Sequence, residues 1–262
     1  MLFRSLSTIP VLFNYWAKAK DGLETSKFFN DHIADTVIKN PKRFIGIGTV
    51  PLQDVDMAIA EMERCVSELK MPGLEIGSNI NGENLSEKKF FLFYKRAEEL
   101  GCALFIHPWE MMGEQQMQKY WLPWLVGMPA ETSRAICSMI FGGVLEAFPK
   151  LRIAFAHGGG SFPLIIGRIE HGFTVRPDLV AVDNDINPRA YIGKFWIDSL
   201  VHDEKAMQYI IDVMGEDNIC LGSDYPFPLG EHHPGKLIEQ MNLKTELKEK
   251  LLFKNAQAWL GL

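Results

Sequence analysis

Three polar residues that could bind a metal ion or transfer a proton stand at the ends of apolar runs. His107 ends ALFIH, His157 ends RIAFAH, and Asp224 ends NICLGSD. Imidazole nitrogens and carboxylate oxygens are common ligands of divalent ions such as zinc, and such an ion can acidify a bound water to near neutral pH. A single histidine at a strand end is often only a hydrogen-bonded structural residue. Three such residues at equivalent positions predict a shared site.

The number of donors limits what spacing alone can establish. A catalytic zinc usually has at least three protein ligands and a water molecule. His107 and Asp224 are too few, and the sequence offers no obvious further donors beside them. Spacing alone therefore leaves metal binding open.

Three glycines, residues 158–160, follow His157 directly and are followed by Ser161. Glycines allow the backbone to pass close to a ligand, and a helix start there could present amide N–H groups to an anion, with Ser161 as the helix cap. The alternative is that the glycines only make a tight turn between a strand and a helix. Both interpretations remain open from the sequence.

The elements that would position these residues alternate along the chain. Short apolar runs typical of strands are separated by longer stretches whose apolar residues recur every three to four positions, as in helices. The predicted strands are 2–9, 44–50, 73–78, 103–108, 152–158, 195–200 and 218–224, and the clearest predicted helices are 54–69, 86–100 and 132–148. Parallel strands joined by crossover helices produce this order.

This series predicts an α/β fold of the (β/α)8 TIM-like barrel type, in one domain over residues 1–262. A barrel of this kind closes with eight strands, whereas seven are predicted, so one β/α unit is expected to be missing, most simply the first. The missing strand should leave a gap between the runs at 2–9 and 218–224. An open doubly wound sheet is the alternative, but no GxGxxG turn follows the first strand.

Composition excludes some partners. The 262 residues are 47% hydrophobic and carry a formal net charge of -6, without a basic cluster that would bind nucleic acid. No window is apolar enough to predict a membrane span. The four cysteines are scattered without a CxxC pair, which favours a reduced, cytosolic protein.

Aromatic and basic residues supply further candidates. Trp109, Trp121 and Trp124 lie in a long predicted loop and could line a planar substrate pocket or pack against a lid or a second subunit. Arg168 and Arg176 follow the glycine run and could bind a substrate carboxylate, although a single arginine is more often a surface residue.

Six longer motifs, in order, resemble a known family. FIHPW, KYWLPWLVGMPAET, FAHGGGSFP, GRIEHGF, RPDL and LGSDYPFPLGE are similar to the metal-dependent decarboxylase branch of the amidohydrolase superfamily, and within it to enzymes that act on a carboxymuconate semialdehyde. The resemblance extends over essentially the whole chain. It implies a distorted barrel with one zinc ion, oxygen-independent decarboxylation in tryptophan breakdown through kynurenine, and a homodimer.

The same resemblance implies roles for individual residues. His107 and Asp224 would bind the zinc ion. His157 would take a proton from the water bound to the zinc and return a proton as the carboxylate leaves. Trp124 would line the substrate pocket, and Arg168 would reach across the dimer interface to a substrate carboxylate.

One feature of the family is not found. Its members begin with a strand ending in HxH, whose two histidines also bind the metal, and no HxH occurs in this sequence. This agrees with the count of seven strands and predicts an N-terminally shortened barrel. Two alternatives follow: a related decarboxylase of an aromatic acid, or a fragment without activity that retains only interaction surfaces.

Overall fold

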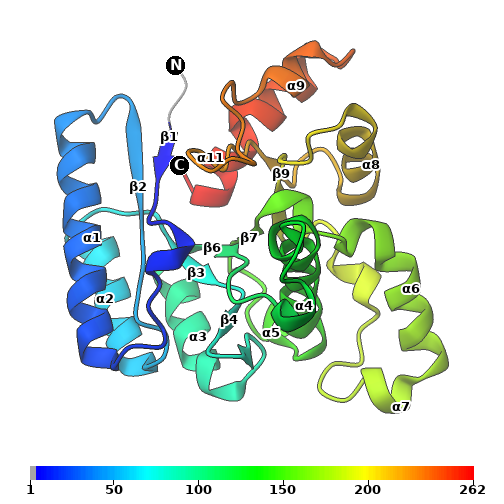
Figure 1. The fold of residues 1–262 in the computed structure, drawn as a ribbon, viewed down its shortest axis with the longest axis horizontal. Coiled ribbons are helices and arrows are strands. Elements are labelled where there is room, and N and C mark those ends of the chain that lie inside the picture. The colour runs from blue at the N-terminus through cyan, green and yellow to red at the C-terminus, as the bar shows by residue number, and fades with distance from the viewer. Residues whose placement is uncertain (1–3) are drawn as a thin grey trace.

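Seven parallel strands form one curled sheet in the computed structural model, which describes residues 4–262 (Figure 1). Their order is β1-β2-β3-β6-β7-β8-β9, so neighbouring strands follow one another along the chain. The bounds are β1 Arg4–Leu6, β2 Phe44–Gly48, β3 Gly73–Gly77, β6 Ala103–His107, β7 Ile153–Phe155, β8 Trp196–Asp198 and β9 Ile219–Cys220. Each lies within a run predicted from the sequence, and the fold is a partial or complete barrel of the TIM type.

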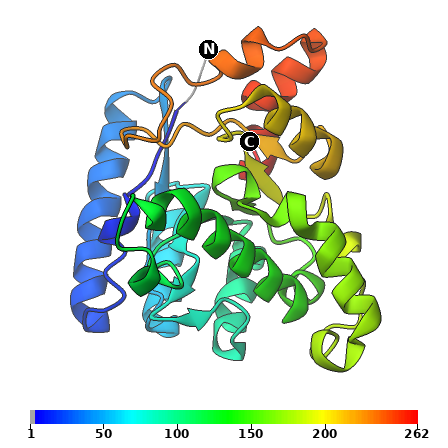
Figure 2. The same ribbon diagram turned by 45° about the vertical axis from the view of Figure 1, so that its right-hand side comes forward.

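The helices lie outside the curled sheet, as the two views show (Figures 1 and 2). The bounds are α1 Ala19–Lys39, α2 Val55–Ser67, α3 Phe91–Leu100, α4 Met128–Phe141, α5 Val144–Ala147, α6 Phe162–Val175, α7 Pro177–Val180, α8 Glu204–Met214, α9 Lys236–Gln240, α10 Thr245–Glu249 and α11 Asn255–Leu260. The helices α1 to α8 lie between successive strands of the chain, whereas α9, α10 and α11 follow the last strand.

Two details differ from the predicted elements. The helix expected over 132–148 is two helices, α4 and α5, because Gly143 between them has a φ of 74°. A short antiparallel hairpin, β4 Asn79–Ile80 with β5 Glu83–Asn84, follows β3 and was not predicted. Strands of two residues produce no alternating pattern that a sequence could reveal.

The two ends of the sheet are β1 and β9. Within residues 4–262, β1 pairs only with β2 and β9 only with β8. Among the described residues, the segments 4–9 and 218–224 therefore do not pair with one another, and the sheet stays open between β1 and β9.

A small apolar cluster fills the inside of the curled sheet, at the end opposite the carboxyl ends of the strands. It includes Ile47, Ala103, Ala154 and Cys220 from four strands and Trp259 from α11. Trp259 packs edge to face against Phe105 with ring centroids 6.0 Å apart. The last helix therefore closes the interior, and the polar residues lie at the opposite end.

No helix in the described part of the chain has the length and apolar character needed to cross a membrane.

Candidate metal and proton-transfer site

His107, His157 and Asp224 meet at the carboxyl end of the sheet. One ligand atom from each residue lies within 4.8 Å of the others. Asp224 Oδ1 is 3.8 Å from the Nε2 of both imidazoles, and the two rings are nearly perpendicular at 4.8 Å between centroids. The structure thus brings together residues that are up to 117 positions apart in the sequence.

His107 ends β6 and its free nitrogen points into the site. Its Nδ1 lies 3.0 Å from the carbonyl oxygen of Pro108. Because a carbonyl only accepts, the proton of a neutral ring is on Nδ1 and the lone pair is on Nε2. That Nε2 is buried and has no hydrogen-bond partner among residues 4–262. Burial also lowers the pKa of His107, which favours the neutral ring that a metal ion requires.

His157 does not lie on a strand, contrary to the prediction that it ends 152–158. β7 stops at Phe155, and His157 begins a short turn with a φ of 57°. The amide of Gly158 donates a 2.8 Å hydrogen bond to Asp198 Oδ1 at the end of β8. Asp198 therefore fixes the backbone that presents the His157 imidazole.

The glycine run makes a tight turn and does not form an anion site. A Cβ on Gly160 would lie 2.3 Å from the carbonyl oxygen of Pro129, and the φ of Gly160 is 61°. The amides of Gly158 to Ser161 all bond within the protein. Ser161 makes no side-chain cap on α6, so that expectation was wrong. The glycines are needed because neighbouring chain passes too close for a side chain.

Asp224 also lies beyond its strand. β9 ends at Cys220, and Asp224 has a φ of 45° in a turn in which the Phe227 amide donates to its carbonyl oxygen. Burial would raise the pKa of the carboxyl, but the imidazoles of His107 and His157 outweigh this, so the pKa of Asp224 lies below its usual range. The site therefore presents an anionic carboxylate.

This donor set fits a divalent ion. The imidazole nitrogen of His107 and the carboxylate oxygen of Asp224 are typical ligands of zinc or manganese, and His157 lies beside them. Ligands at about 2.0–2.1 Å in tetrahedral geometry are roughly 3.4 Å apart, so the 3.8 Å separation between His107 Nε2 and Asp224 Oδ1 would close by a few tenths of an ångström around an ion. The unpartnered Nε2 of His107 is the atom that such an ion would satisfy.

Glu75 was missed by the sequence reasoning. It lies in the middle of β3 and is 2% exposed, and its Oε2 has no hydrogen-bond partner in the described part of the chain. Its pKa is raised to about 8, mainly by burial. A hydrogen bond from Ser7 lowers the pKa, and the negative charge of Asp224 raises it. Asp198 in β8 was missed as well. For both Glu75 and Asp198, the feature of the sequence that could have indicated a role is an acidic residue inside a short apolar strand.

Trp124 and Arg168 lie outside the cluster. Trp124 is in a turn of π-helix, Pro123–Gly127, is 38% exposed and stacks on Trp121 with centroids 5.8 Å apart. Arg168 is exposed on α6. Arg176 pairs with Asp178 two residues away, which makes it a surface residue of the turn into α7.

Comparisons with known proteins agree with this geometry. A family model described as amidohydrolase matches residues 9–262. The chain belongs to the amidohydrolase family. A 2-amino-3-carboxymuconate-6-semialdehyde decarboxylase of Dictyostelium discoideum is 59% identical over 258 residues, which are 98% of this chain and 72% of the relative. A Caenorhabditis elegans protein of the same name is 39% identical over 98% of this chain and 77% of its own length.

Solved structures of this family show the same fold. A 5-carboxyvanillate decarboxylase of Sphingomonas paucimobilis superposes with a TM-score of 0.89 at 28% identity, over 99% of this chain and 78% of that one. Another, from Novosphingobium aromaticivorans, was crystallised with manganese and superposes with a TM-score of 0.90 at 25% identity, over 100% of this chain and 77% of that one. The amidohydrolase described here is thus a member of a branch of carboxy-lyases whose relatives bind divalent metal.

Proposed function

We propose that this amidohydrolase is a zinc-dependent, oxygen-independent decarboxylase of 2-amino-3-carboxymuconate 6-semialdehyde. Its product would be 2-aminomuconate 6-semialdehyde, which directs tryptophan and kynurenine breakdown away from quinolinate and NAD synthesis. The convergence of His107, His157 and Asp224 within 4.8 Å carries the proposal. The 59% identity to a relative of that name supports the substrate.

Each of the three residues has a part in the chemistry. His107, through Nε2, and Asp224, through Oδ1, would hold the ion, which when bound supplies a Lewis acid and lowers the pKa of a water. His157 Nε2 lies 3.8 Å from Asp224 Oδ1, close enough to exchange a proton with a reactant held at the ion. When the C–C bond to the carboxylate breaks, the carboxylate carbon leaves as carbon dioxide and the bonding electron pair stays on the substrate carbon. Protonated His157 would then give its proton to that carbon, which replaces the broken C–C bond with a C–H bond.

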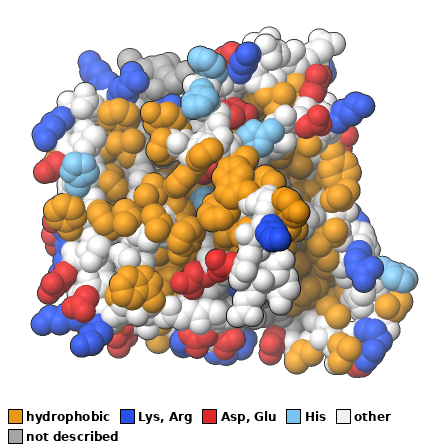
Figure 3. All heavy atoms as spheres, in the orientation of Figure 1, with side chains coloured by type: hydrophobic (Ala, Val, Ile, Leu, Met, Phe, Trp, Pro, Cys, Tyr) orange, Lys and Arg blue, Asp and Glu red, His pale blue; other side chains and the backbone are white. Residues whose placement is uncertain are grey.

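Substrate binding and assembly complete the proposal. Trp124 would line the pocket, and Arg168 on α6 would bind a substrate carboxylate in the other subunit of a homodimer. Several large apolar side chains of one loop are exposed, namely Tyr120, Trp121, Trp124, Leu125 and Val126. Figure 3 shows hydrophobic side chains gathered across the middle of one face. A face of this kind favours contact with a second copy.

A cytosolic location fits the cysteines. All four are free thiols, and three of them are buried.

Turnover of the semialdehyde by metal-loaded protein tests the proposal. Loss of substrate absorbance is followed after addition of Zn²⁺ or Mn²⁺ to the wild-type protein, to His157→Ala and to His171→Ala. The exposed His171 on α6 is the matched control. We expect His157→Ala to lower kcat by about 10²- to 10⁴-fold and His171→Ala to leave it unchanged. Normal turnover by His157→Ala would contradict the role of His157.

Decarboxylation of an aromatic acid is the second candidate, because two solved relatives of this fold are 5-carboxyvanillate decarboxylases. Carbon dioxide release from dihydroxybenzoates and carboxyvanillate under the same conditions distinguishes the two. Activity confined to the aromatic acids would reverse the assignment. A folded dimer that holds no metal and turns over neither class would support an interaction role instead.

A further inference from the structure

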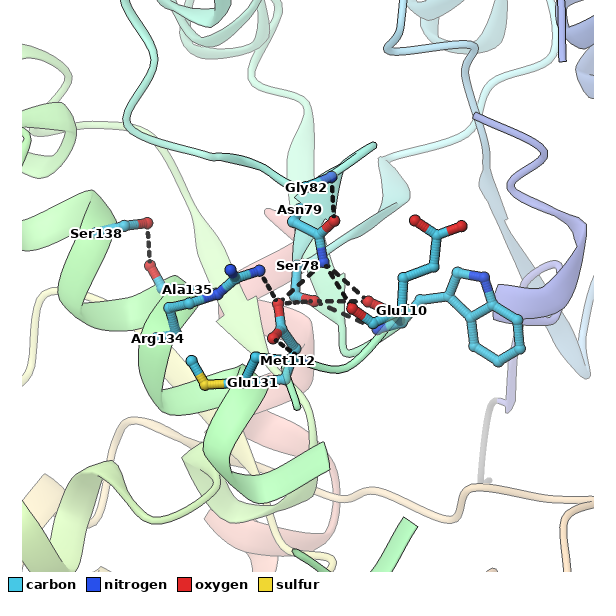
Figure 4. A network of polar contacts seen from close by, with 10 residues as sticks. Ser78, Asn79, Gly82, Glu110, Met112, Glu131, Arg134, Ala135 and Ser138 are labelled. Atoms are coloured by element: carbon cyan, nitrogen blue, oxygen red, sulfur yellow. Dashed lines mark hydrogen bonds and ion pairs between the residues drawn. The ribbon is translucent and has the colours of Figure 1, made fainter. Parts of the chain in front are cut away.

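A buried carboxylate, Glu131, is connected to His107 by a chain of hydrogen bonds. Glu131 is the fourth residue of α4 and is fully buried. Its Oε1 accepts hydrogen bonds from Ser78 Oγ at 3.0 Å and from Asn79 Nδ2 at 3.0 Å, and it pairs with Arg134 at 2.5 Å. Figure 4 shows these side chains pointing toward one another from α4 and from the two residues that follow β3.

The chain continues through one peptide group. The amide of Trp109 donates to Ser78 Oγ at 3.3 Å. The carbonyl of that same peptide belongs to Pro108 and accepts from His107 Nδ1 at 3.0 Å. The order is therefore imidazole N–H, peptide C=O, peptide N–H, serine hydroxyl and carboxylate. Every donor in the series points the same way, toward Glu131.

The direction of the serine hydroxyl follows from its neighbours. Ser78 Oγ lies 3.0 Å from the Glu131 carboxylate and 3.5 Å from the Trp109 carbonyl. The shorter contact is to an ionised acceptor, which attracts the hydroxyl proton more strongly. The oxygen lone pairs of Ser78 are then free for the Trp109 amide.

Other hydrogen bonds fix the peptide groups on either side of this one. Asn79 Nδ2 donates 2.9 Å to the Trp109 carbonyl, and the Glu131 Oε2 accepts from the Met112 amide at 3.2 Å. The Ser78 amide donates to the His107 carbonyl at 3.0 Å. The segment from His107 to Met112 thus has little freedom to rotate its peptide groups.

We infer that Glu131 is a positioning residue that, through Ser78 and the peptide between Pro108 and Trp109, holds His107 with its proton on Nδ1 and its lone pair on Nε2. A histidine ligand generally donates its second N–H to a carboxylate or carbonyl, and this partner fixes the tautomer and raises the basicity of the ligand nitrogen. Here the peptide and the serine transmit the polarisation of a buried anion, because hydrogen bonds in series strengthen one another. The inference rests on the proposed role of His107 as a metal ligand.

Two variants break the chain at different points. Glu131→Gln removes the negative charge and keeps the shape, and Ser78→Ala removes the hydroxyl link and keeps Glu131. Glu61→Gln is the matched control: Glu61 is also fully buried and also pairs with an arginine three residues later, Arg64, but it lies on α2 and contacts Asn30 instead of the site.

The first measurement is the tautomer of His107 in metal-free protein, from two-bond ¹H–¹⁵N correlations of ¹⁵N-histidine. His107→Gln assigns the signal by its loss. We expect the Nδ1–H form in the wild type and in Glu61→Gln, and an increased population of the Nε2–H form in Glu131→Gln and Ser78→Ala. This readout needs neither bound metal nor turnover, so it stands apart from the test of the proposed function.

The second measurement is affinity for Zn²⁺ or Mn²⁺ by chelator competition. Loss of a residue that supports a metal ligand typically weakens binding by about 10- to 100-fold, and we expect about tenfold for either variant because the effect passes through intermediate groups. Glu61→Gln should bind as the wild type does. If Ser78→Ala is folded and keeps both the Nδ1–H tautomer and wild-type affinity, the inference is overturned, whether or not Glu131→Gln folds.

Discussion

Glu75 should make the stability of this protein fall as the pH rises, and replacing it should remove that dependence. The carboxyl is 2% exposed in the middle of β3, and its Oε2 has no hydrogen-bond partner among the residues that the structure describes. Burial raises its pKa from 4.5 to about 8. The folded state therefore holds a proton that the unfolded chain releases at a much lower pH.

The sign and size follow from linkage. Below pH 4.5 the Glu75 carboxyl is protonated in both the folded and the unfolded state, so it does not lower the free energy of unfolding. Between pH 4.5 and about 8 only the folded state keeps the proton, and the free energy of unfolding falls as the pH rises. The decline ends when the carboxyl is ionised in both states. The full effect is roughly 4–5 kcal/mol at 1.36 kcal/mol per pKa unit, and roughly 3 kcal/mol of it falls between about pH 5.5 and about pH 8.5. Glu75→Gln cannot ionise and lacks this slope.

Urea unfolding at these two pH values, with a chelator present, measures the difference. The free energy of unfolding of Glu75→Gln relative to the wild type should rise by about 3 kcal/mol from the lower to the higher pH. Glu61→Gln keeps Glu75 and should keep the wild-type dependence. A change of less than about 1 kcal/mol in Glu75→Gln would show that Glu75 is ionised at little cost in the folded protein.

Substitutions at Gly160 and Asp198 test the turn that presents His157, and a substitution at Asp224 tests the ligand set. Gly160→Ala should lower the free energy of unfolding by more than about 2 kcal/mol, because its Cβ would lie 2.3 Å from a carbonyl oxygen at a φ of 61°. Gly172→Ala in α6, where a Cβ meets nothing within 4 Å, should be neutral or stabilising in the same urea titration. Asp198→Ala should lower the free energy of unfolding by about 1–3 kcal/mol and reduce kcat, because it frees the turn that carries His157. Asp198→Asn keeps an acceptor for the Gly158 amide and should retain most of the stability and most of the activity. Equal losses in the two variants would argue against this hydrogen bond. Asp224→Asn should weaken Zn²⁺ binding at least about tenfold in chelator competition, and unchanged affinity would remove Asp224 from the ligand set.

The strands and the edge at which the site lies could be predicted from the sequence. Each strand is a local apolar run, and in a series of strand and helix units neighbouring strands lie side by side. This was sufficient to place His107, at the end of β6, and the open ends at β1 and β9. The strand lengths were overestimated, because each apolar run continues past the last paired residue of its strand into the turn that follows.

The backbone at His157 and Asp224 could not be predicted. Both residues adopt a positive φ, which non-glycine residues rarely do and which no local pattern indicates. For His157, the bond between the Gly158 amide and Asp198 comes from a residue 40 positions away. The distance between two such side chains depends on contacts made only after the sheet has curled.

What the sequence determined by itself was the set of reactive residue types and the order of the elements that carry them, because both depend on neighbours along the chain. The tertiary structure alone decided which buried polar groups act on that set. Glu75, Asp198 and Glu131 are ordinary acidic residues in the sequence, and each acquires its effect from burial and from partners far along the chain. When an ionisable group is removed from water, its few remaining hydrogen bonds determine its protonation state and its effect on neighbouring groups. Which hydrogen bonds remain depends on the folded structure.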